Sequence, residues 1–264
     1  GFITAMKWLL FAIIMAGLII WWRSAHVEQN NRSTAKPKPK NQVTPKLMSQ
    51  CPFCGVRFPS DEGAGNYCSV AHKKAIDSRG WWGEAEWIKS PNYDERPTNM
   101  PVELVLVHHI SLPPGQFSGN YIADFFQNKL DPKAHPYFES IADRQVSSHF
   151  LIRRNGQVQQ FVSANHRAWH AGVSDFFGRE RCNDFSIGIE LEGTDDLPFQ
   201  PAQYTSLREL VFALKKTYPI AAYAGHSDVA PGRKTDPGIH FDWQLFSKLA
   251  EISEKEMPYG TQKR

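Results

Sequence analysis

The sequence predicts an α/β protein whose largest part is a mixed β-sheet flanked by helices. The largely apolar run Val102–Val107 is typical of a strand buried on both faces. Ser186–Glu192 alternates apolar residues with others, as a strand with two different faces does. After Pro201, apolar residues recur at helical spacing (Tyr204, Leu207, Leu210, Val211 and Leu214). Strands and helices mixed in this way favour the α/β class.

Length and composition limit the number of domains and the kind of partner. The chain has 264 residues, of which 41% are hydrophobic and 12% aromatic, and this composition suits a well-packed core. It is too long for one minimal domain, yet it need not hold two large ones. The net charge of +3 is small, and no stripe of basic and aromatic residues is present. The sequence therefore predicts no nucleic-acid partner.

Residues 1–25 are predicted to form a transmembrane anchor. Trp8–Trp22 is an uninterrupted apolar stretch, and apolar residues before it extend it toward the roughly 20 residues that a bilayer needs. A signal peptide is the alternative, although no small-x-small cleavage site follows. Six basic residues follow closely and only Lys7 precedes. The positive-inside rule then predicts a single-pass protein of the inner membrane with its main domain in the cytoplasm.

Residues 26–48 are predicted to be a disordered linker. Lys36–Lys40 alternates lysine with proline, a composition that cannot form a core and favours a semi-extended chain. Its lysines favour contact with anionic lipid.

Residues 49–78 are predicted to form a small zinc-ribbon-like module. Cys51 and Cys54 form a C-x2-C pair, and after thirteen residues Cys68 and His72 form a C-x3-H pair. Three thiolates and one imidazole make a closed, structural type of zinc site, and so short a segment could hardly fold without the metal. Three unrelated reduced cysteines are the alternative. Structural support and docking of a partner, such as a membrane protein, both remain open as roles.

The main domain is predicted to span residues 79–258, with a tail at 259–264. Within it, Ser147–Arg153 and Gln157–Val162 are separated by a short Asn-Gly turn, which predicts a β-hairpin. A closing helix is predicted to begin near Asp242.

Residues suited to metal-assisted hydrolysis lie far apart in this domain. Zinc in a hydrolase takes three protein ligands and keeps one position open for water. The segment Gly225–Gly238 offers His226 and Asp236 as two of them. The best third donor is His108 at the end of a predicted strand, with His109 beside it. Taken singly, each could be a core histidine or a turn residue.

Four segments of the domain together closely resemble the AmpD-type zinc amidases. They are Leu106–Gly115, Ala168–Gly172, Arg179–Asp195 and Arg233–Gly238. The resemblance runs from about residue 80 to 249 and implies the fold shared by AmpD and the peptidoglycan-recognition proteins. It also implies hydrolysis of the amide bond between 1,6-anhydro-N-acetylmuramic acid and L-alanine, a step of peptidoglycan recycling.

The resemblance also implies roles for single residues. The zinc ligands fall on His108, His226 and Asp236, because the first histidine after the strand binds the metal in this family. The catalytic roles fall on Glu190 and Lys234. A carboxylate can take the proton of a zinc-bound water and pass it to the leaving amine, and an ammonium can stabilise the oxyanion.

Two more residues match substrate-binding positions of the family. Trp169 matches a position at the sugar end, where a flat ring suits an apolar sugar face. Arg181 matches a position that binds a carboxylate of diaminopimelate, for which a guanidinium offers bidentate contact. Some relatives have another arginine just before Val146, where this chain has Gln145 preceded by Arg144. The contacts with the peptide are therefore expected to differ from those in these relatives.

Three functions remain in competition at this point. The first is a membrane-tethered amidase for anhydro-muropeptides with one catalytic and one structural zinc. The second is a periplasmic amidase that acts on intact peptidoglycan, and the third is a non-catalytic muropeptide sensor. Retention of Glu190, Lys234 and all three ligands argues against the sensor. The remaining histidines of the domain are expected to be structural or to lie behind the ligands (His135, His149, His166, His170 and His240).

Overall fold

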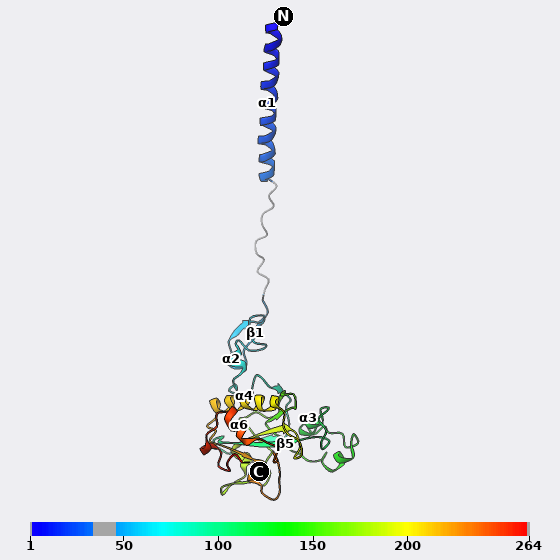
Figure 1. Cartoon of the computed structure of the whole chain (residues 1–264), viewed down its shortest axis with the longest axis vertical. Helices are drawn as coiled ribbons and strands as arrows, with labels where there is room; N and C mark the ends of the chain where they lie inside the picture. Colours follow the sequence, from blue (N-terminus) through cyan, green and yellow to red (C-terminus); the bar gives the residue numbers. More distant parts are fainter. Residues whose placement is uncertain (1, 34–45, 263–264) are drawn as a thin grey trace. The chain divides into compact units, whose positions relative to one another are not determined.

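The structure, a computed structural model, describes residues 2–33 and 46–262. The chain divides into two units, residues 1–46 and residues 47–264 (Figure 1). The first unit holds a single described helix. The second holds both the cysteine-rich segment and the α/β domain.

Helix α1, Phe2–Ser33, does not bear out the predicted membrane anchor. Within residues 2–33 and 46–262, no helix is long and apolar enough to cross a membrane. The predicted transmembrane anchor, and the single-pass, cytoplasm-facing location inferred from it, are therefore wrong. The apolar stretch Trp8–Trp22 rises about 22 Å at 1.5 Å per residue, which is short of the roughly 30 Å of a hydrocarbon core. Lys7 interrupts its extension toward the N-terminus.

The predicted linker at 26–48 differs from the structure at both ends. Helix α1 continues past Ala25 to Ser33, and strand β1 begins at Met48. The lysine- and proline-rich part of the linker lies within residues 34–45, outside the described residues, and remains a prediction.

The cysteine-rich segment is a hairpin followed by one helical turn. Strands β1 (Met48–Gln50) and β2 (Arg57–Pro59) pair in antiparallel fashion, and helix α2 spans Val70–Lys73. Ser69 caps this helix by accepting a hydrogen bond from the His72 N–H at 3.2 Å. The buried apolar core here is small and consists of Cys51, Phe58 and Tyr67.

A six-stranded mixed sheet organises the rest of the second unit, as predicted. Its strand order is β12-β5-β11-β6-β7-β3. Strand β5 (Leu104–Ile110) lies between β12 (Ala222–Gly225) and β11 (Ser186–Glu192), and all three are parallel. Strand β6 (Phe150–Ile152) continues the parallel set, β7 (Val158–Gln160) is antiparallel to it, and β3 (Glu86–Trp87) forms the edge.

Helices cover the two faces of this sheet unequally. On one face, α4 (Pro201–Thr217) and α6 (Trp243–Leu249) lie together (Figure 1) and pack on Val105 and Val107 of β5 in the largest hydrophobic cluster. On the other face, Leu104 and Leu106 pack in a smaller cluster, and α3 (Tyr121–Phe126) belongs to a third. Because successive residues of a strand face opposite ways, the face away from α4 carries the even-numbered residues of β5.

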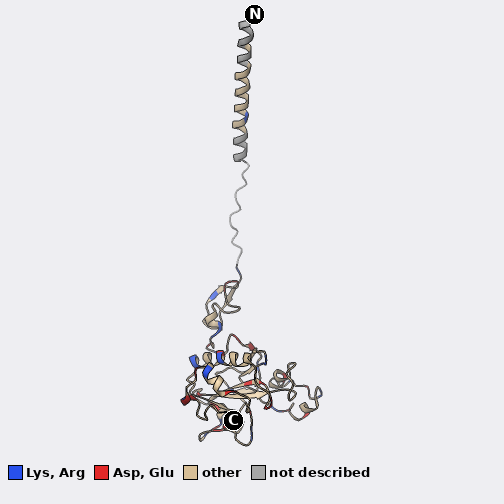
Figure 2. Cartoon of the chain, in the orientation of Figure 1, with Lys and Arg blue, Asp and Glu red and all other residues tan. Residues whose placement is uncertain are grey.

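Short elements complete the second unit. They are β4 (Tyr93–Asp94), which pairs with β8 (Arg167–Ala168), β9 (Asp175–Phe176), which pairs with β10 (Arg179–Glu180), α5 (His226–Val229), and the 3-10 turns Pro136–Ser140, Cys182–Asp184 and Glu254–Glu256. Basic and acidic residues are scattered among one another over this unit (Figure 2). Several form pairs, such as Lys215 with Glu256 at 3.0 Å.

The predicted elements are present with shifted ends. The hairpin forms from β6 and β7 with Gly156 at φ +86° in its turn, a conformation that glycine adopts readily. Helix α6 begins after Asp242, whose carboxylate accepts the Leu245 N–H at 2.8 Å. Strand β5 runs on to Ile110 because β11 pairs with it along its whole length. His108 and His109 therefore lie inside the strand rather than after it.

Candidate active site

Strand register places three polar side chains in one row on the face of the sheet away from α4. Glu190 of β11 is the direct partner of His108 in β5. On the other side of β5, Gly225 is the partner of Val107, so His226 follows at the level of His108. The odd–even alternation points these side chains away from the α4 core. The row forms because three parallel strands end at the same edge.

Asp236 completes a tight group with two members of this row. Its Oδ2 atom lies 2.9 Å from His108 Nδ1 and 3.0 Å from His226 Nδ1, and the two Nδ1 atoms are 3.0 Å apart. The Ser227 N–H donates to the carbonyl of Asp236 at 2.8 Å. That bond holds the loop bearing Asp236 against the start of α5. All three side chains are buried.

The hydrogen bonds behind the two imidazoles show that this group suits a cation. His226 Nε2 lies 3.0 Å from the carbonyl oxygen of Ala171, which can only accept, so the ring carries a proton on Nε2. In the neutral ring, Nδ1 then presents a lone pair to the Asp236 carboxylate and to His108. Lone pairs crowded in a buried site repel unless a positive charge lies between them. Two nitrogens and one carboxylate oxygen are a donor set typical of catalytic zinc.

The ionisation of His108 and Asp236 agrees with the donor set. Burial, with His226 as the next cause, lowers the pKa of His108 to about 4. Burial alone would raise the pKa of Asp236, but its contacts with His108 and His226 hold that pKa far below its ordinary value. Neutral imidazoles and an ionised carboxylate are the forms that bind a metal.

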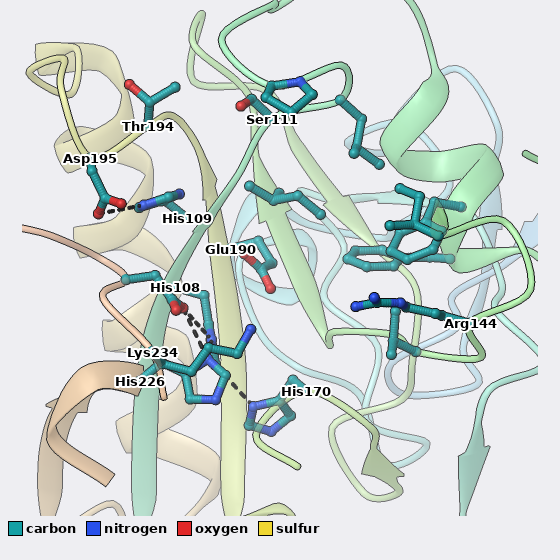
Figure 3. Close-up of a pocket in the computed structure, with 18 of the residues that line it drawn as sticks. His108, His109, Ser111, Arg144, His170, Glu190, Thr194, Asp195, His226 and Lys234 are labelled. Carbon is teal, nitrogen blue, oxygen red and sulfur yellow. Dashed lines mark hydrogen bonds and ion pairs between the residues drawn. The ribbon is translucent and has the colours of Figure 1, made fainter. Parts of the chain in front are cut away.

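His109 turns away from this group, which resolves the choice between the two adjacent histidines. Its Nε2 atom lies 3.0 Å from Asp195 Oδ1, and the Thr235 hydroxyl donates to Asp195 Oδ2 at 2.9 Å. Asp195 thereby ties the end of β5 to the loop just before Asp236 (Figure 3). His108 is the member of the pair that meets His226 and Asp236.

Glu190 and Lys234 lie beside the three-residue group, where the sequence predicted them. The Glu190 side chain points into the cavity from β11, with the Lys234 ammonium below it near His108 (Figure 3). Burial raises the pKa of Glu190 well above its ordinary value, Asp236 raises it further, and Lys234 opposes the shift. Glu190 Oε2 is buried without a hydrogen-bond partner in the structure. A buried carboxylate oxygen of this kind is suited to meet a water or a substrate.

A cavity of about 630 Å³ opens from this group. The metal-binding candidates, Glu190 and Lys234 belong to its lining. Aromatic side chains also line it, among them Phe125, Phe126, Tyr137 and Trp169. The combination of apolar walls with a few convergent polar groups is typical of a small-molecule site.

The structure separates the two predicted substrate-binding residues. Trp169 lines the cavity, whereas Arg181 is absent from its lining. Arg181 lies at φ +59°, its side chain is 70% exposed, and its Nε atom lies 3.3 Å from Asp184. Arg144 lines the cavity instead and directs its guanidinium inward (Figure 3). The change at Gln145 was the sequence signal that could have pointed to Arg144.

The cysteine-rich segment brings a second set of possible metal ligands together. Cys51, Cys54, Cys68 and His72 place their ligand atoms within 4.8 Å of one another. His72 Nδ1 lies 3.0 Å from Cys68 Sγ, and Cys54 Sγ lies 3.6 Å from Cys68 Sγ. Burial opposes ionisation of Cys51, but backbone N–H groups, chiefly that of Cys68, lower the pKa of this thiol to about 6. Within the described residues, none of this segment lines the cavity.

Comparison with known families identifies the domain that carries the cavity. The profile of the N-acetylmuramoyl-L-alanine amidase family (Amidase_2) matches residues 98–239, more than half of the chain. The match includes the His108 group, Glu190 and Lys234. The chain belongs to this family. It is an amidase, and the sensor hypothesis is set aside.

Named relatives support the same assignment. The chain is 53% identical over 171 residues to the 1,6-anhydro-N-acetylmuramyl-L-alanine amidase AmpD of Haemophilus influenzae, covering 64% of this chain and 93% of the relative. It is 53% identical over 173 residues to AmpD of Escherichia coli K12, covering 65% and 94%. A crystal structure of a selenomethionine AmpD derivative matches with 54% identity and a TM-score of 0.64, covering 65% and 97%. The predicted AmpD-type amidase fold is thus confirmed.

The cysteine-rich segment lies outside the matched family region. The profile begins at residue 98, and the segment was predicted at 49–78. The comparisons give no support to a zinc ribbon there. A metal at these four residues is supported by their own geometry alone.

Proposed function

We propose that the amidase hydrolyses, with zinc, the amide bond between 1,6-anhydro-N-acetylmuramic acid and L-alanine of muropeptides, a reaction of peptidoglycan recycling. The observation that carries the proposal is the convergence of His108, His226 and Asp236 beside the unpartnered Glu190 oxygen. The AmpD relatives, named for this amide bond, support the choice of substrate. We propose residues 79–258 as the amidase domain.

The three converging side chains would hold the catalytic zinc through His108 Nδ1, His226 Nδ1 and an Asp236 oxygen. Zinc held in this way lowers the pKa of a bound water to about 7 and polarises a carbonyl group. Glu190 accepts the proton of the attacking water and returns it to the nitrogen of the leaving L-alanine. Its buried oxygen is suited to this task because it has no competing hydrogen bond.

Lys234 would stabilise the charge that develops on the carbonyl oxygen. Its ammonium lies near His108 and below Glu190 in the view of Figure 3. A positive charge held beside the carbonyl group interacts more strongly with an oxyanion than with the neutral carbonyl. The position of Lys234 two residues before the ligand Asp236 makes its placement depend on the same loop.

The aromatic part of the cavity would take the rest of the substrate. Trp169 offers a flat face for the apolar side of the sugar, and Phe125 and Phe126 line the same cavity. We assign to Arg144 the contact with a carboxylate of the peptide that the sequence suggested for Arg181. Arg144 directs its guanidinium into the cavity (Figure 3), whereas Arg181 is turned to Asp184.

A second, structural zinc is proposed at Cys51, Cys54, Cys68 and His72. Four ligands would complete the tetrahedral coordination that structural zinc prefers. The segment is joined to the amidase domain by several contacts. Ile76 bridges to Trp82, and the Trp82 indole N–H donates to the Lys74 carbonyl at 3.1 Å. This zinc would stabilise the fold and take no part in the chemistry.

Digestion of two substrates by the full chain tests the proposal. Zinc-loaded protein is incubated with anhydro-muropeptide and with intact peptidoglycan sacculi, and the released peptide is followed by mass spectrometry. The proposal predicts release from the anhydro-muropeptide and much slower release from sacculi. Equal digestion of sacculi would favour the intact-peptidoglycan alternative, and no release from either would refute both.

A further inference from the structure

Two consecutive residues, His170 and Ala171, hold both ligand imidazoles from behind. His108 Nε2 lies 3.0 Å from His170 Nδ1, and His226 Nε2 lies 3.0 Å from the carbonyl oxygen of Ala171. We propose that this pair, here called the strap, is a positioning element that presents Nδ1 of both histidines to the metal. The inference rests on the proposed function, because it takes the His108 group to bind zinc.

The hydrogen bonds beyond His108 run in one consistent direction. A metal on His108 Nδ1 requires the ring proton on Nε2, which then donates to His170 Nδ1. His170 must in turn carry its proton on Nε2, where Ser186 Oγ lies at 3.3 Å. The Ser186 hydroxyl donates to the carbonyl oxygen of Cys182 at 2.5 Å. In the opposite order His170 would carry its proton on Nδ1, and its bare Nε2 would face the Ser186 oxygen, whose hydrogen is directed to Cys182. The order described above avoids that contact between two lone pairs, so this chain of hydrogen bonds favours the metal-binding tautomer of His108.

The strap is itself fixed by side chains from two other parts of the chain. The Asn183 side-chain oxygen accepts the backbone N–H groups of His170 at 3.2 Å and of Ala171 at 2.8 Å. The Arg233 guanidinium donates to the Ala171 carbonyl at 2.7 Å. Asn183 is buried. The Asn183 side-chain oxygen thereby fixes the backbone of the two residues that contact the ligand imidazoles.

The His170 ring fits against the sheet because Gly188 of β11 has no side chain. A Cβ atom on Gly188 of β11 would lie 2.5 Å from Cγ of His170, closer than side chains can pack. His170 also meets the ring of His149 with 5.5 Å between centroids, and the Gly188 N–H donates to His149 Nδ1 at 3.0 Å. Gly188 and His149 therefore restrict the position of the imidazole, and in that position it reaches His108.

A positioning role and a space-filling role predict different results for substitutions at His170. The outer partner of a zinc-bound histidine typically affects metal affinity by about 10- to 100-fold. Leucine keeps much of the volume but has no acceptor. The Oδ1 atom of asparagine can take the place of the imidazole Nδ1, so His170→Asn keeps the acceptor that His108 needs. Volume alone would favour leucine, and hydrogen bonding favours asparagine.

The test measures zinc affinity in full-length His170→Leu and His170→Asn chains by competition with a chelator. Cobalt substitution distinguishes the sites, because a thiolate-to-cobalt absorption arises only from the cysteine cluster. We expect His170→Leu to weaken binding at the His108 site by about 10- to 100-fold, and His170→Asn to stay within about threefold of the wild type. The half-buried His135, substituted by alanine, serves as the control and should leave zinc affinity at the His108 site unchanged.

A second, smaller substitution keeps the test informative if the His170→Leu chain fails to fold. Ser186→Ala removes only the hydroxyl that accepts from His170, and it should weaken zinc binding severalfold with the cysteine cluster still loaded. Wild-type affinity in both His170→Leu and Ser186→Ala would overturn the inference. If the wild type itself bound no zinc at this site, the proposed function would fail first, so the two failures are distinguishable.

Discussion

The two groups of possible metal ligands in this chain are built in opposite ways. Cys51, Cys54, Cys68 and His72 come from one short segment with a core of three buried residues. His108, His226 and Asp236 come from the ends of neighbouring strands and a loop, up to 128 positions apart in sequence. The first group depends on local spacing, whereas the second depends on the register of a whole sheet.

The difference in construction goes with a difference in surroundings. The cysteine group has four ligands, enough to surround a zinc ion, and none of it lines the cavity. The three-residue group would leave one position open on a four-coordinate zinc ion, and Glu190 and Lys234 line the same cavity. A closed site can stabilise a fold, and an open site beside a base can perform hydrolysis. This difference supports the proposal that one metal would stabilise the fold and the other would serve the chemistry.

Glu190→Gln should have the largest effect on turnover. The amide keeps the shape of the side chain but cannot accept the proton, and loss of a general base typically costs about 10²- to 10⁴-fold. The rate of peptide release and the zinc content are measured together. Zinc content should stay at the wild-type value, and near wild-type turnover would refute the role of Glu190.

Lys234→Met should have the next largest effect. Loss of one oxyanion donor typically lowers kcat by about 10²- to 10³-fold. Lys216→Met, an exposed lysine of α4, is the matched control and should leave the rate unchanged. A loss confined to KM, with kcat intact, would show that Lys234 binds the ground state only.

Arg144→Ala should have a smaller effect that depends on the substrate. A hydrogen-bonded charge pair contributes about 1.5–3 kcal/mol, so kcat/KM for a peptide with its carboxylates should fall about tenfold or more. Arg181→Ala is the control and should have little effect. A larger fall in kcat/KM for Arg181→Ala than for Arg144→Ala would instead support the role that the sequence suggested for Arg181.

Cys54→Ser should leave turnover nearly unchanged below its melting temperature. Loss of the structural zinc should loosen the segment that contacts Trp82 and lower Tm, by about 2–4 °C for each kcal/mol lost. Thermal unfolding and kcat are measured on the same preparation. Cys182→Ala, a buried cysteine outside the cluster, should keep its full zinc content.

The parts of the fold that local patterns determine could be predicted from the sequence. The β6–β7 hairpin, helix α4 and the start of α6 depend on turn chemistry, apolar periodicity and capping, all of which are local. The ends of β5 were misjudged because pairing with β11, a long-range contact, extends the strand to Ile110. Apolar content suggested a membrane span, but the uninterrupted stretch Trp8–Trp22 is too short for one.

The candidate site shows the same limit. The residue types of the metal group and of Glu190 and Lys234 pointed to hydrolysis, and a family resemblance selected His108 over His109. Only the structure shows that Asp195 engages His109 and that Arg144 rather than Arg181 lines the cavity. The role of His170 depends on its approach to His108 across 62 positions, a contact that no local pattern could reveal.

Zinc content measured together with turnover tests the division between the two metals most directly. The account predicts two zinc ions in the wild type, one in Cys54→Ser with turnover retained, and one in His226→Ala with turnover lost. A Cys54→Ser chain that loses its turnover while the His108 site stays loaded would contradict the account. So would a His226→Ala chain that has lost this zinc and still cleaves muropeptide.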